Sequence, residues 1–203
     1  MLMNKAETFL VNSPANRVFQ RCVETPTLRR LGGRTRGAHA LEIGCGSGYS
    51  TNLIIDQFGA ATVDAVDLDP AMVTRARRRL RRYNDQVRVE QGNADDLRAA
   101  LGAEDSSYDA VFDFGIIHHV TNWRDAVTEV ARVLRPGGTF YYLEVTAAAL
   151  ARPSFRRLLD HPTEDRFTAG QFLAELTSQG LDPADSWRTY VGSDYLAGVA
   201  NRS

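Results

Sequence analysis

The chain has 203 residues, of which 43% are hydrophobic and 24% charged, with a formal net charge of −1 at pH 7. These values indicate an ordinary globular domain and argue against a disordered or fibrous chain. The near-neutral charge disfavours binding to nucleic acid or to an anionic membrane through an overall field. No apolar run approaches the roughly 20 residues of a membrane span. Two cysteines, Cys22 and Cys45, make no disulfide framework, so we expect a cytoplasmic protein.

Strand-like and helix-like segments alternate along the chain. Strands are predicted at residues 40–44, 62–67, 87–91, 108–114, 139–145, 187–191 and 194–200. Helices are predicted at residues 49–58, 70–83, 122–134 and 168–179, with a short helix that ends at Leu101. Strands joined through helices imply right-handed crossovers and a parallel sheet, whereas Gly192-Ser193 leaves room only for an antiparallel hairpin. We therefore expect an α/β fold, a three-layer sandwich with a seven-stranded, mostly parallel sheet whose last strand is antiparallel.

One domain, 1–203, is expected, because no repeat or linker divides the chain. Residues 1–38 are predicted to form an N-terminal helical cap and 39–145 a ligand-binding core. Residues 146–203 would supply an insertion, a C-terminal helix and the hairpin. The cap and the insertion at 147–167 either set specificity, as loops on a fixed scaffold often do, or merely cover sheet edges.

The most informative motif is the glycine-rich turn after the first strand. Gly44, Gly46 and Gly48 stand at alternate positions directly before a helix. A strand, a glycine turn and a helix let the backbone approach a nucleotide-like ligand closely. Tyr49 stands where a dinucleotide fingerprint has its third glycine, so NAD is disfavoured. Any tight strand-to-helix turn can contain glycines, and the motif is weak by itself.

An acidic residue, Asp67, ends the second strand. Its two carboxylate oxygens can accept both hydroxyls of a ribose, which indicates a ribose without deciding the cofactor. Leu68 would then cover one face of an adenine. Asp69 precedes Pro70 and is interpreted as a helix cap.

Two neighbouring histidines follow the fourth strand, where open α/β sheets bind ligands. His118 and His119 could suggest a metal site, but neighbours on a strand or turn rarely converge on one ion, and we expect none. His119 is interpreted either as a structural or substrate-orienting residue or as a general base. The arginine-rich helix at 75–82 keeps an apolar face, so its arginines are interpreted as solvated, and no nucleic-acid partner is expected.

The order of these motifs resembles the class I S-adenosylmethionine-dependent methyltransferases, which have a Rossmann-like fold. Within that superfamily it is most similar to the small-molecule group that includes the ubiquinone/menaquinone-type enzymes (methyltransferase domain 11-like). The resemblance covers roughly residues 38–145 and implies S-adenosyl-L-methionine as cofactor and S-adenosyl-L-homocysteine as product. The residues that it implies for cofactor binding are Glu42, Gly44, Cys45, Gly46, Asp67, Leu68, Asn93, Ala94, Asp95, Gly115 and Ile116.

The resemblance also assigns a part of the cofactor to each loop. Residues 44–46 would lie along the aminocarboxypropyl tail, with Glu42 anchoring the turn or meeting the ammonium group through water. The backbone N–H of Ala94 and the carboxylate of Asp95 would meet the adenine edge, although Asp95 alone could be an ordinary turn residue. Many relatives have Asp where this chain has Asn93. Gly115 and Ile116 would lie near the methionine end.

The function implied is methyl transfer to a small-molecule acceptor, on oxygen, nitrogen or carbon. A sulfonium methyl group is already activated, so the protein must chiefly align the acceptor and exclude water. Where the acceptor must lose a proton, His119, His118 and Glu144 are the candidate catalytic residues. The alternatives are a nicotinamide-dependent oxidoreductase and a non-catalytic S-adenosylmethionine-binding domain. We expect a monomer or homodimer.

Overall fold

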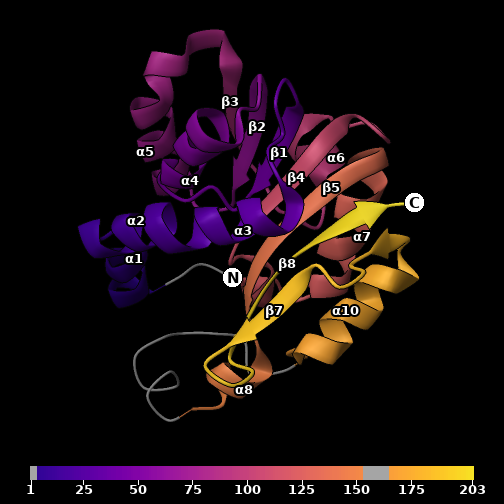
Figure 1. Ribbon diagram of the computed structural model, residues 1–203. Coiled ribbons are helices and arrows are strands. Elements are labelled where there is room, and N and C mark those ends of the chain that lie inside the picture. The colour runs from indigo at the N-terminus through magenta and orange to yellow at the C-terminus, as the bar shows by residue number, and fades with distance from the viewer. Residues whose placement is uncertain (1–3, 153–164) are drawn as a thin grey trace.

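The computed structural model describes residues 4–152 and 165–203, and within them eight strands form one mixed sheet (Figure 1). The strands are β1 (His39–Ile43), β2 (Thr62–Asp67), β3 (Val87–Gln91), β4 (Tyr108–Phe114), β5 (Leu134–Val145), β6 (Leu181–Asp182), β7 (Trp187–Tyr190) and β8 (Tyr195–Arg202). Their order is β3-β2-β1-β4-β5-β8-β6, and β7 also pairs with β8. The first five strands are parallel to one another, and β8 runs antiparallel to β5.

The predicted fold class and the antiparallel last strand are confirmed, but the sheet has one strand more than the seven predicted. The additional strand, β6, is only two residues long, too short to leave a periodic pattern in the sequence. It pairs with the end of β8 at Arg202 and Asn201, whereas β7 pairs with the beginning of β8. The two short strands therefore follow one another along the same edge of β8.

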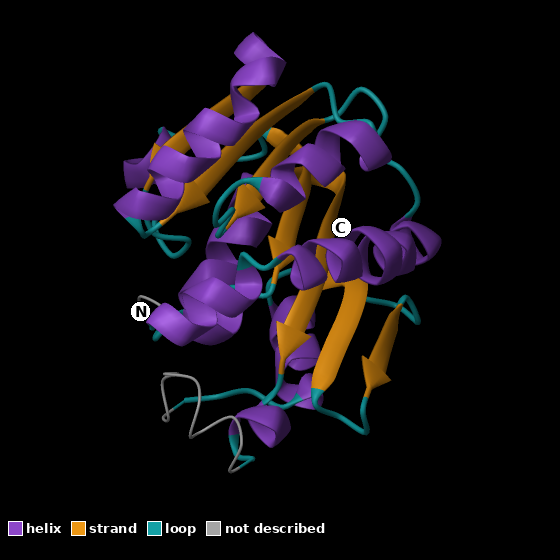
Figure 2. Cartoon of the chain, turned by 90° about the vertical axis from the view of Figure 1, so that its left-hand side faces the viewer, coloured by secondary structure: helices purple, strands orange, loops and turns teal. Residues whose placement is uncertain are grey.

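Helices cover both faces of the sheet and complete the three layers (Figures 1 and 2). They are α1 (Lys5–Val11), α2 (Pro14–Phe19), α3 (Thr25–Gly32), α4 (Tyr49–Leu53), α5 (Pro70–Leu80), α6 (Leu97–Leu101), α7 (Trp123–Val133), α8 (Ala147–Leu150) and α10 (Ala169–Ser178). One helical turn at Gln20–Glu24 joins α2 to α3, and another at Ile54–Phe58 extends α4. Among the described residues no helix is long and apolar enough to cross a membrane.

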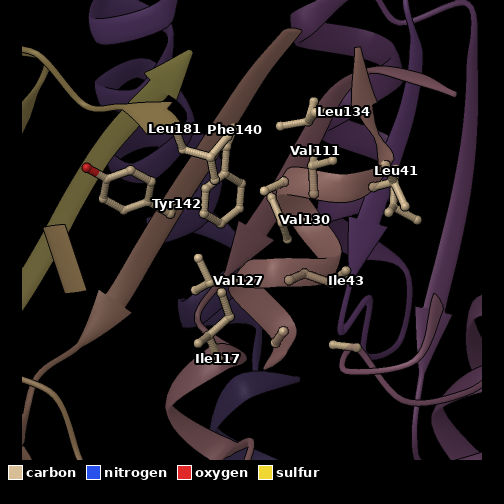
Figure 3. Close-up of a cluster of buried hydrophobic side chains, with 14 of the residues drawn as sticks. Leu41, Ile43, Val111, Ile117, Val127, Val130, Leu134, Phe140, Tyr142 and Leu181 are labelled. Carbon is tan, nitrogen blue, oxygen red and sulfur yellow. The ribbon is translucent and has the colours of Figure 1, made fainter. Parts of the chain in front are cut away.

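Side chains that alternate along a strand divide the core between the two faces. Leu41 and Ile43 face the layer of α6, α7 and α10, where Val127 and Val130 pack against strand residues such as Phe140 (Figure 3). Ala40, on the opposite face of β1, belongs to the layer of α3 and of the helical turn Ile54–Phe58. This alternation places the side chain of every second strand residue on a known side of the sheet.

The caps that begin the helices follow from the sequence. Asp69 accepts a hydrogen bond from the N–H of Ala71 (2.8 Å) and begins α5, which confirms the predicted cap. Thr168 and Gln171 form a capping box at the start of α10. Helix α5 buries Met72, Val73, Ala76 and Leu80, and Arg75, Arg77 and Arg78 are exposed as predicted. Arg79 departs from that prediction, because it is half-buried and donates to the carbonyl of Ser47 (2.8 Å).

The segment before β1, from Lys5 to Gly32, is helical except for a turn at Asn12 and Ser13, and it is called the cap below. Its last helix packs on the sheet, where Leu28 is buried and the hydroxyl of Tyr141 donates to the carbonyl of Gly32 (2.8 Å). A Cβ at Gly32 would lie 2.6 Å from the Tyr141 ring, so glycine permits this close packing. The expected insertion is described only in part, since residues 153–164, with Pro153, Phe155 and Pro162, lie outside the described residues.

Candidate functional site

A cavity of about 720 Å³ lies at the carboxyl ends of the parallel strands, where ligands bind to open α/β sheets. Its size is typical of a small-molecule site. Two sets of sheet residues line it. The glycine-turn half consists of residues 44–47, 67–69 and 92–94, and the histidine half of lining residues within 114–120, 143–145 and 190–197. The cap supplies lining residues between Glu7 and Thr27.

The cap touches both halves of the cavity. On one side the guanidinium of Arg17 lies 5.9 Å from the centre of the Tyr49 ring, next to the glycine turn, which is within cation–π range. On the other side Glu7 reaches His119, with 3.5 Å between Oε1 and Nε2. The cap therefore closes over the cavity and contributes to each of its ends.

The glycine turn has the left-handed backbone that only glycine adopts readily. The φ angles are +67° at Gly44, +52° at Gly46 and +78° at Gly48. A Cβ at Gly44 would lie 2.4 Å from the Ile116 side chain, so this glycine lets the turn pack against the loop after β4. A Cβ at Gly46 would meet nothing within 4 Å. Gly46 thus presents bare backbone to the cavity, which an elongated ligand can approach.

Asp67 connects the glycine turn to the end of β2. It accepts the N–H of Gly46 (2.7 Å) and the N–H of Asp69 (2.9 Å), one on each oxygen. A carboxylate has about four acceptor positions, so two remain for a ligand with paired hydroxyls. Burial raises the pKa of Asp67 above its ordinary value, and the two N–H bonds oppose that shift. Leu68 follows with 39% of its surface exposed and also lines the cavity.

Two predicted cofactor residues lie away from the cavity lining. Glu42 is fully buried beneath the turn, where the hydroxyl of Thr51 donates to its carboxylate. Burial raises the pKa of Glu42 to about 7. Of the two places predicted for Glu42, this one corresponds to an anchor for the turn and the first turns of α4. Asp95 is half-buried and does not line the cavity, although Asn93 and Ala94 do. Its contact with an adenine stays a prediction.

The histidine half is built on a pair of buried carboxyl groups, Asp113 and Glu144. Asp113 accepts the N–H of Gly115 (3.0 Å) and of Ile116 (2.8 Å). Glu144 accepts the N–H of Ile117 (2.7 Å). Burial and the neighbouring Glu144 hold the pKa of Asp113 well above its usual range, and burial also raises the pKa of Glu144. Both oxygens of Glu144 accept backbone N–H groups, from Ile117 on one and from His118 and Val145 on the other.

His118 lies against this pair and lines the cavity. Its Nδ1 is 2.6 Å from Oε2 of Glu144, and only 4% of the residue is exposed. Because Glu144 also accepts backbone N–H groups, we assign the proton of that contact to Nδ1. The basic nitrogen of a neutral His118 is then Nε2. An imidazole oriented by a carboxylate is the arrangement that serves general bases in many enzymes.

His119 is equally buried but has a different surrounding. Its ring centre lies 4.2 Å from that of His118, and its charged partner is Glu7 of α1. The predicted pair therefore separates into one histidine held by the sheet and one held by the cap. Within the described residues, no group of three or more His, Cys, Asp or Glu side chains could hold a metal ion.

Several residues at the site were not predicted from the sequence. Asp113 could have been recognised as an acid at the end of a strand, directly before Phe114 and Gly115. Glu7 and Glu24 carry no such signal, because only packing brings the cap to the cavity. Glu24 lines the cavity, and burial raises its pKa to about 7. Arg166 donates to the carbonyl of Val120 (3.2 Å) and holds the histidine loop from outside.

Comparisons with known proteins agree with this arrangement. Residues 40–138 match a family described as a methyltransferase domain. A probable S-adenosylmethionine-dependent methyltransferase of Mycolicibacterium smegmatis is 40% identical over 169 residues, which are 81% of this chain and 60% of that protein. A fatty-acid O-methyltransferase of the same organism is 33% identical over 147 residues, 72% of this chain and 47% of that protein. The chain thus spans less than two thirds of these curated relatives.

Solved structures show the same fold. An S-adenosylmethionine-dependent methyltransferase of Aquifex aeolicus superposes with a TM-score of 0.71 at 17% identity, covering 98% of this chain and 99% of that one. One of Mesorhizobium loti gives a TM-score of 0.69 at 19% identity, with 87% and 96% covered.

The glycine-turn half fits the cofactor of this family. The bare backbone at Gly46 suits an aminocarboxypropyl tail, and the open acceptor positions of Asp67 suit ribose hydroxyls. The cofactor is S-adenosyl-L-methionine, and the chain belongs to the class I S-adenosylmethionine-dependent methyltransferases.

Proposed function

We propose that this protein transfers the methyl group of S-adenosylmethionine to a small-molecule acceptor that loses a proton to His118. The observation that carries the proposal is the buried His118–Glu144 contact of 2.6 Å, at a cavity whose other half fits the cofactor. When bound, the cofactor supplies a methyl group on a positively charged sulfur, already activated for displacement. The residues of the histidine half then have to orient the acceptor, take its proton and exclude water.

The proton has a defined route in this proposal. With the cofactor bound, the acceptor atom would bond to the methyl carbon while the sulfur–methyl bond breaks and S-adenosylhomocysteine leaves. The acceptor's proton would pass to Nε2 of His118. The imidazolium that results keeps its Nδ1–H on Glu144, whose negative charge stabilises it. The low exposure of His118 and Glu144 keeps water from competing for the methyl group.

Cofactor contacts follow from the glycine-turn half. In the proposal, residues 44–46 lie along the amino-acid tail, Asp67 accepts the ribose hydroxyls, and Leu68 covers the adenine. Asn93, Ala94 and Asp95 meet the adenine edge, and Gly115 with Ile116 borders the methionine end. The placement of these residues around one cavity, with Asp95 beside it, supports the assignment.

A small molecule is favoured as the acceptor for two reasons. The cavity is closed over by the cap and is of small-molecule size. The relative named as a fatty-acid O-methyltransferase covers 72% of this chain, so its kind of acceptor is one that this scaffold accommodates. Whether oxygen, nitrogen or carbon is methylated depends on the acceptor's own reactive group.

Two measurements test the proposal. Calorimetric titration is expected to give binding of S-adenosylmethionine and of S-adenosylhomocysteine, and none of NAD. Preferential binding of NAD would contradict the proposal and support a nicotinamide-dependent oxidoreductase instead. Incubation with methyl-labelled S-adenosylmethionine and a panel of alcohols, carboxylic acids, amines and phenols is expected to give labelled product. Binding without transfer to any member of the panel would instead indicate a cofactor-binding domain without catalysis.

A further inference from the structure

Large apolar side chains that remain exposed gather at one place on this molecule. Within the described residues they are Phe9, Leu10, Val11, Val18, Phe19, Val23, Leu68, Tyr190, Val191 and Tyr195. All except Phe9 and Val18 line the cavity of the functional site, so eight of the ten belong to it. Single exposed apolar residues need no explanation, but a concentration of this kind marks a binding surface.

Two segments far apart in the sequence supply this surface. The cap contributes residues such as Phe19 and Val23, and the β7–β8 hairpin contributes Tyr190, Val191 and Tyr195. In Figure 1 the cap crosses in front of the strands and the hairpin lies below it. These residues, together with Leu10 and Val11, are called the mouth below. Leu68 is left out because it belongs to the glycine-turn half.

Exposure and chemistry change together between the mouth and the floor of the cavity. Phe19 is 50% exposed and Val191 is 64% exposed, whereas His118 is 4% and Glu144 is 2% exposed. The inner end of the cavity at His118 and Glu144, called the floor, is therefore polar and titratable. The mouth is apolar and open to solvent. A molecule that fills both must have a polar end and an apolar end.

We propose that the acceptor is an amphiphile: a small polar head that carries the methylated atom, and an unbranched apolar tail of several methylenes. This inference rests on the proposed function for the identity of the head. The head lies on the floor beside His118, and the tail leaves between the cap and the hairpin over the mouth residues. Covering those residues removes apolar surface from water, which is the source of affinity for the tail.

The two exceptions, Phe9 and Val18, help to choose between a tail and a second copy of the chain. Each is adjacent in sequence to a mouth residue, Leu10 or Phe19, and each is more exposed than that neighbour. A flat protein partner on the cap would use the protruding Phe9 and Val18 as well. The apolar residues instead concentrate inside a concavity, which fits a narrow chain.

The experiment measures binding of 1-hexanol, 1-octanol and 1-decanol by displacement of the fluorescent probe 1-anilinonaphthalene-8-sulfonate. Protein with and without S-adenosylhomocysteine is compared. We expect the affinity to rise about threefold to fourfold for each methylene added, which is the effect of burying one such group. An affinity that does not depend on chain length would overturn the proposal.

Matched substitutions locate the binding site. Phe19→Asp and Leu10→Asp are expected to weaken 1-decanol binding by roughly 10-fold or more, because they place a charge on the path of the tail. Val18→Asp and Phe9→Asp introduce the same charge on the neighbouring residue and are expected to change it by less than about twofold. Thermal unfolding checks that all four variants fold. Equal losses of 1-decanol affinity in the mouth variants and in the neighbouring variants would refute the proposal that an apolar tail binds here. A dimer that Phe19→Asp dissociates would also refute it.

This experiment separates the inference from the proposed function. Alcohol displacement needs no methyl transfer, so length-dependent binding without any turnover would leave the amphiphile site standing and refute the proposed activity. Turnover on short polar acceptors without length-dependent binding would do the reverse.

Discussion

The two halves of the cavity are built in different ways. The glycine-turn half consists of three short segments, each directly after one strand, and most of its contacts are made by backbone groups and by Asp67. The histidine half brings together side chains from α1, from the loop after β4 and from β5, with the hairpin alongside. A shared cofactor can be recognised by local backbone geometry, whereas a particular acceptor is recognised by surfaces that tertiary packing assembles.

Buried carboxyl groups also serve the two halves differently. Beneath the glycine turn, Glu42 accepts a hydroxyl and holds the start of α4. In the histidine half, Glu144 accepts His118 and thereby acts on a side chain that faces the cavity. Burial raises the pKa of both groups, but only the second is coupled to a group that can exchange a proton with a substrate. The predictions below test whether the two halves can be damaged independently.

The largest effect is expected from His118→Asn. Loss of a general base lowers kcat by roughly 10²- to 10⁴-fold, while the affinity for S-adenosylhomocysteine stays unchanged. His119→Asn is the matched control and is expected to lower kcat by less than about 10-fold, since its partner belongs to the cap. Steady-state kinetics and calorimetry measure the two quantities. A larger loss of kcat in the His119 variant would exchange the roles of the two histidines.

The second effect concerns stability and pH. Burial raises the pKa of Glu42 to about 7 from an ordinary value of 4.5. Its protonated form favours the folded state below about pH 4.5, and this contribution is lost as the pH rises through about 7. Between about pH 4 and pH 8 the loss approaches 3 kcal/mol. The free energy of unfolding, measured with urea in the absence of cofactor, should therefore decrease over this pH range in both proteins. The decrease should be larger by about that amount in the wild type than in Glu42→Gln.

A surface control completes the pH experiment. Glu104→Gln changes an exposed glutamate and is expected to leave the pH dependence of unfolding as it is in the wild type. If the free energy of unfolding of Glu42→Gln depends on pH as strongly as that of this control, the raised pKa does not belong to Glu42.

The third effect is on cofactor affinity. Asp67→Ala removes the acceptor of the Gly46 N–H and, in the proposal, of the ribose hydroxyls. Hydrogen bonds to a charged group of this kind are worth about 2 kcal/mol, so affinity for S-adenosylhomocysteine should fall roughly 30-fold by calorimetry. Asp96→Ala removes an aspartate that only caps α6 and does not line the cavity, and should leave affinity unchanged. Equal affinities for S-adenosylhomocysteine in the two variants would show that Asp67 does not bind the cofactor.

The smallest effect is expected from Glu7→Gln in the cap. Its carboxylate lies 3.5 Å from His119 and is 4% exposed, so the neutral amide weakens a buried contact. We expect a loss of about 1 kcal/mol in unfolding free energy and a rise in the acceptor KM of less than about 10-fold. Cofactor affinity should not change. A fall in cofactor affinity instead of a rise in acceptor KM would show that α1 belongs functionally to the glycine-turn half.

Much of the fold was predictable because its signals are local. The parallel strands carry apolar residues in short runs or at alternate positions, and turn or capping residues follow several of them, as Asp69 does when it begins α5. Strand β6 lacked a signal because two residues have no periodicity. The glycine turn could be recognised because Gly44 and Gly46 need a left-handed backbone that other residues rarely adopt.

By itself, the amino-acid sequence determined most of the strand and helix pattern, because backbone geometry at a strand end depends on a few consecutive residues. The family and the cofactor followed from the resemblance of its motifs to known methyltransferases. Only the tertiary structure decided that His118 belongs to Glu144 and His119 to Glu7, and that the cap and hairpin form one apolar mouth. Those contacts join residues 26 and 112 positions apart. Their proximity follows from how helices and strands bury apolar surface together, which no local motif encodes.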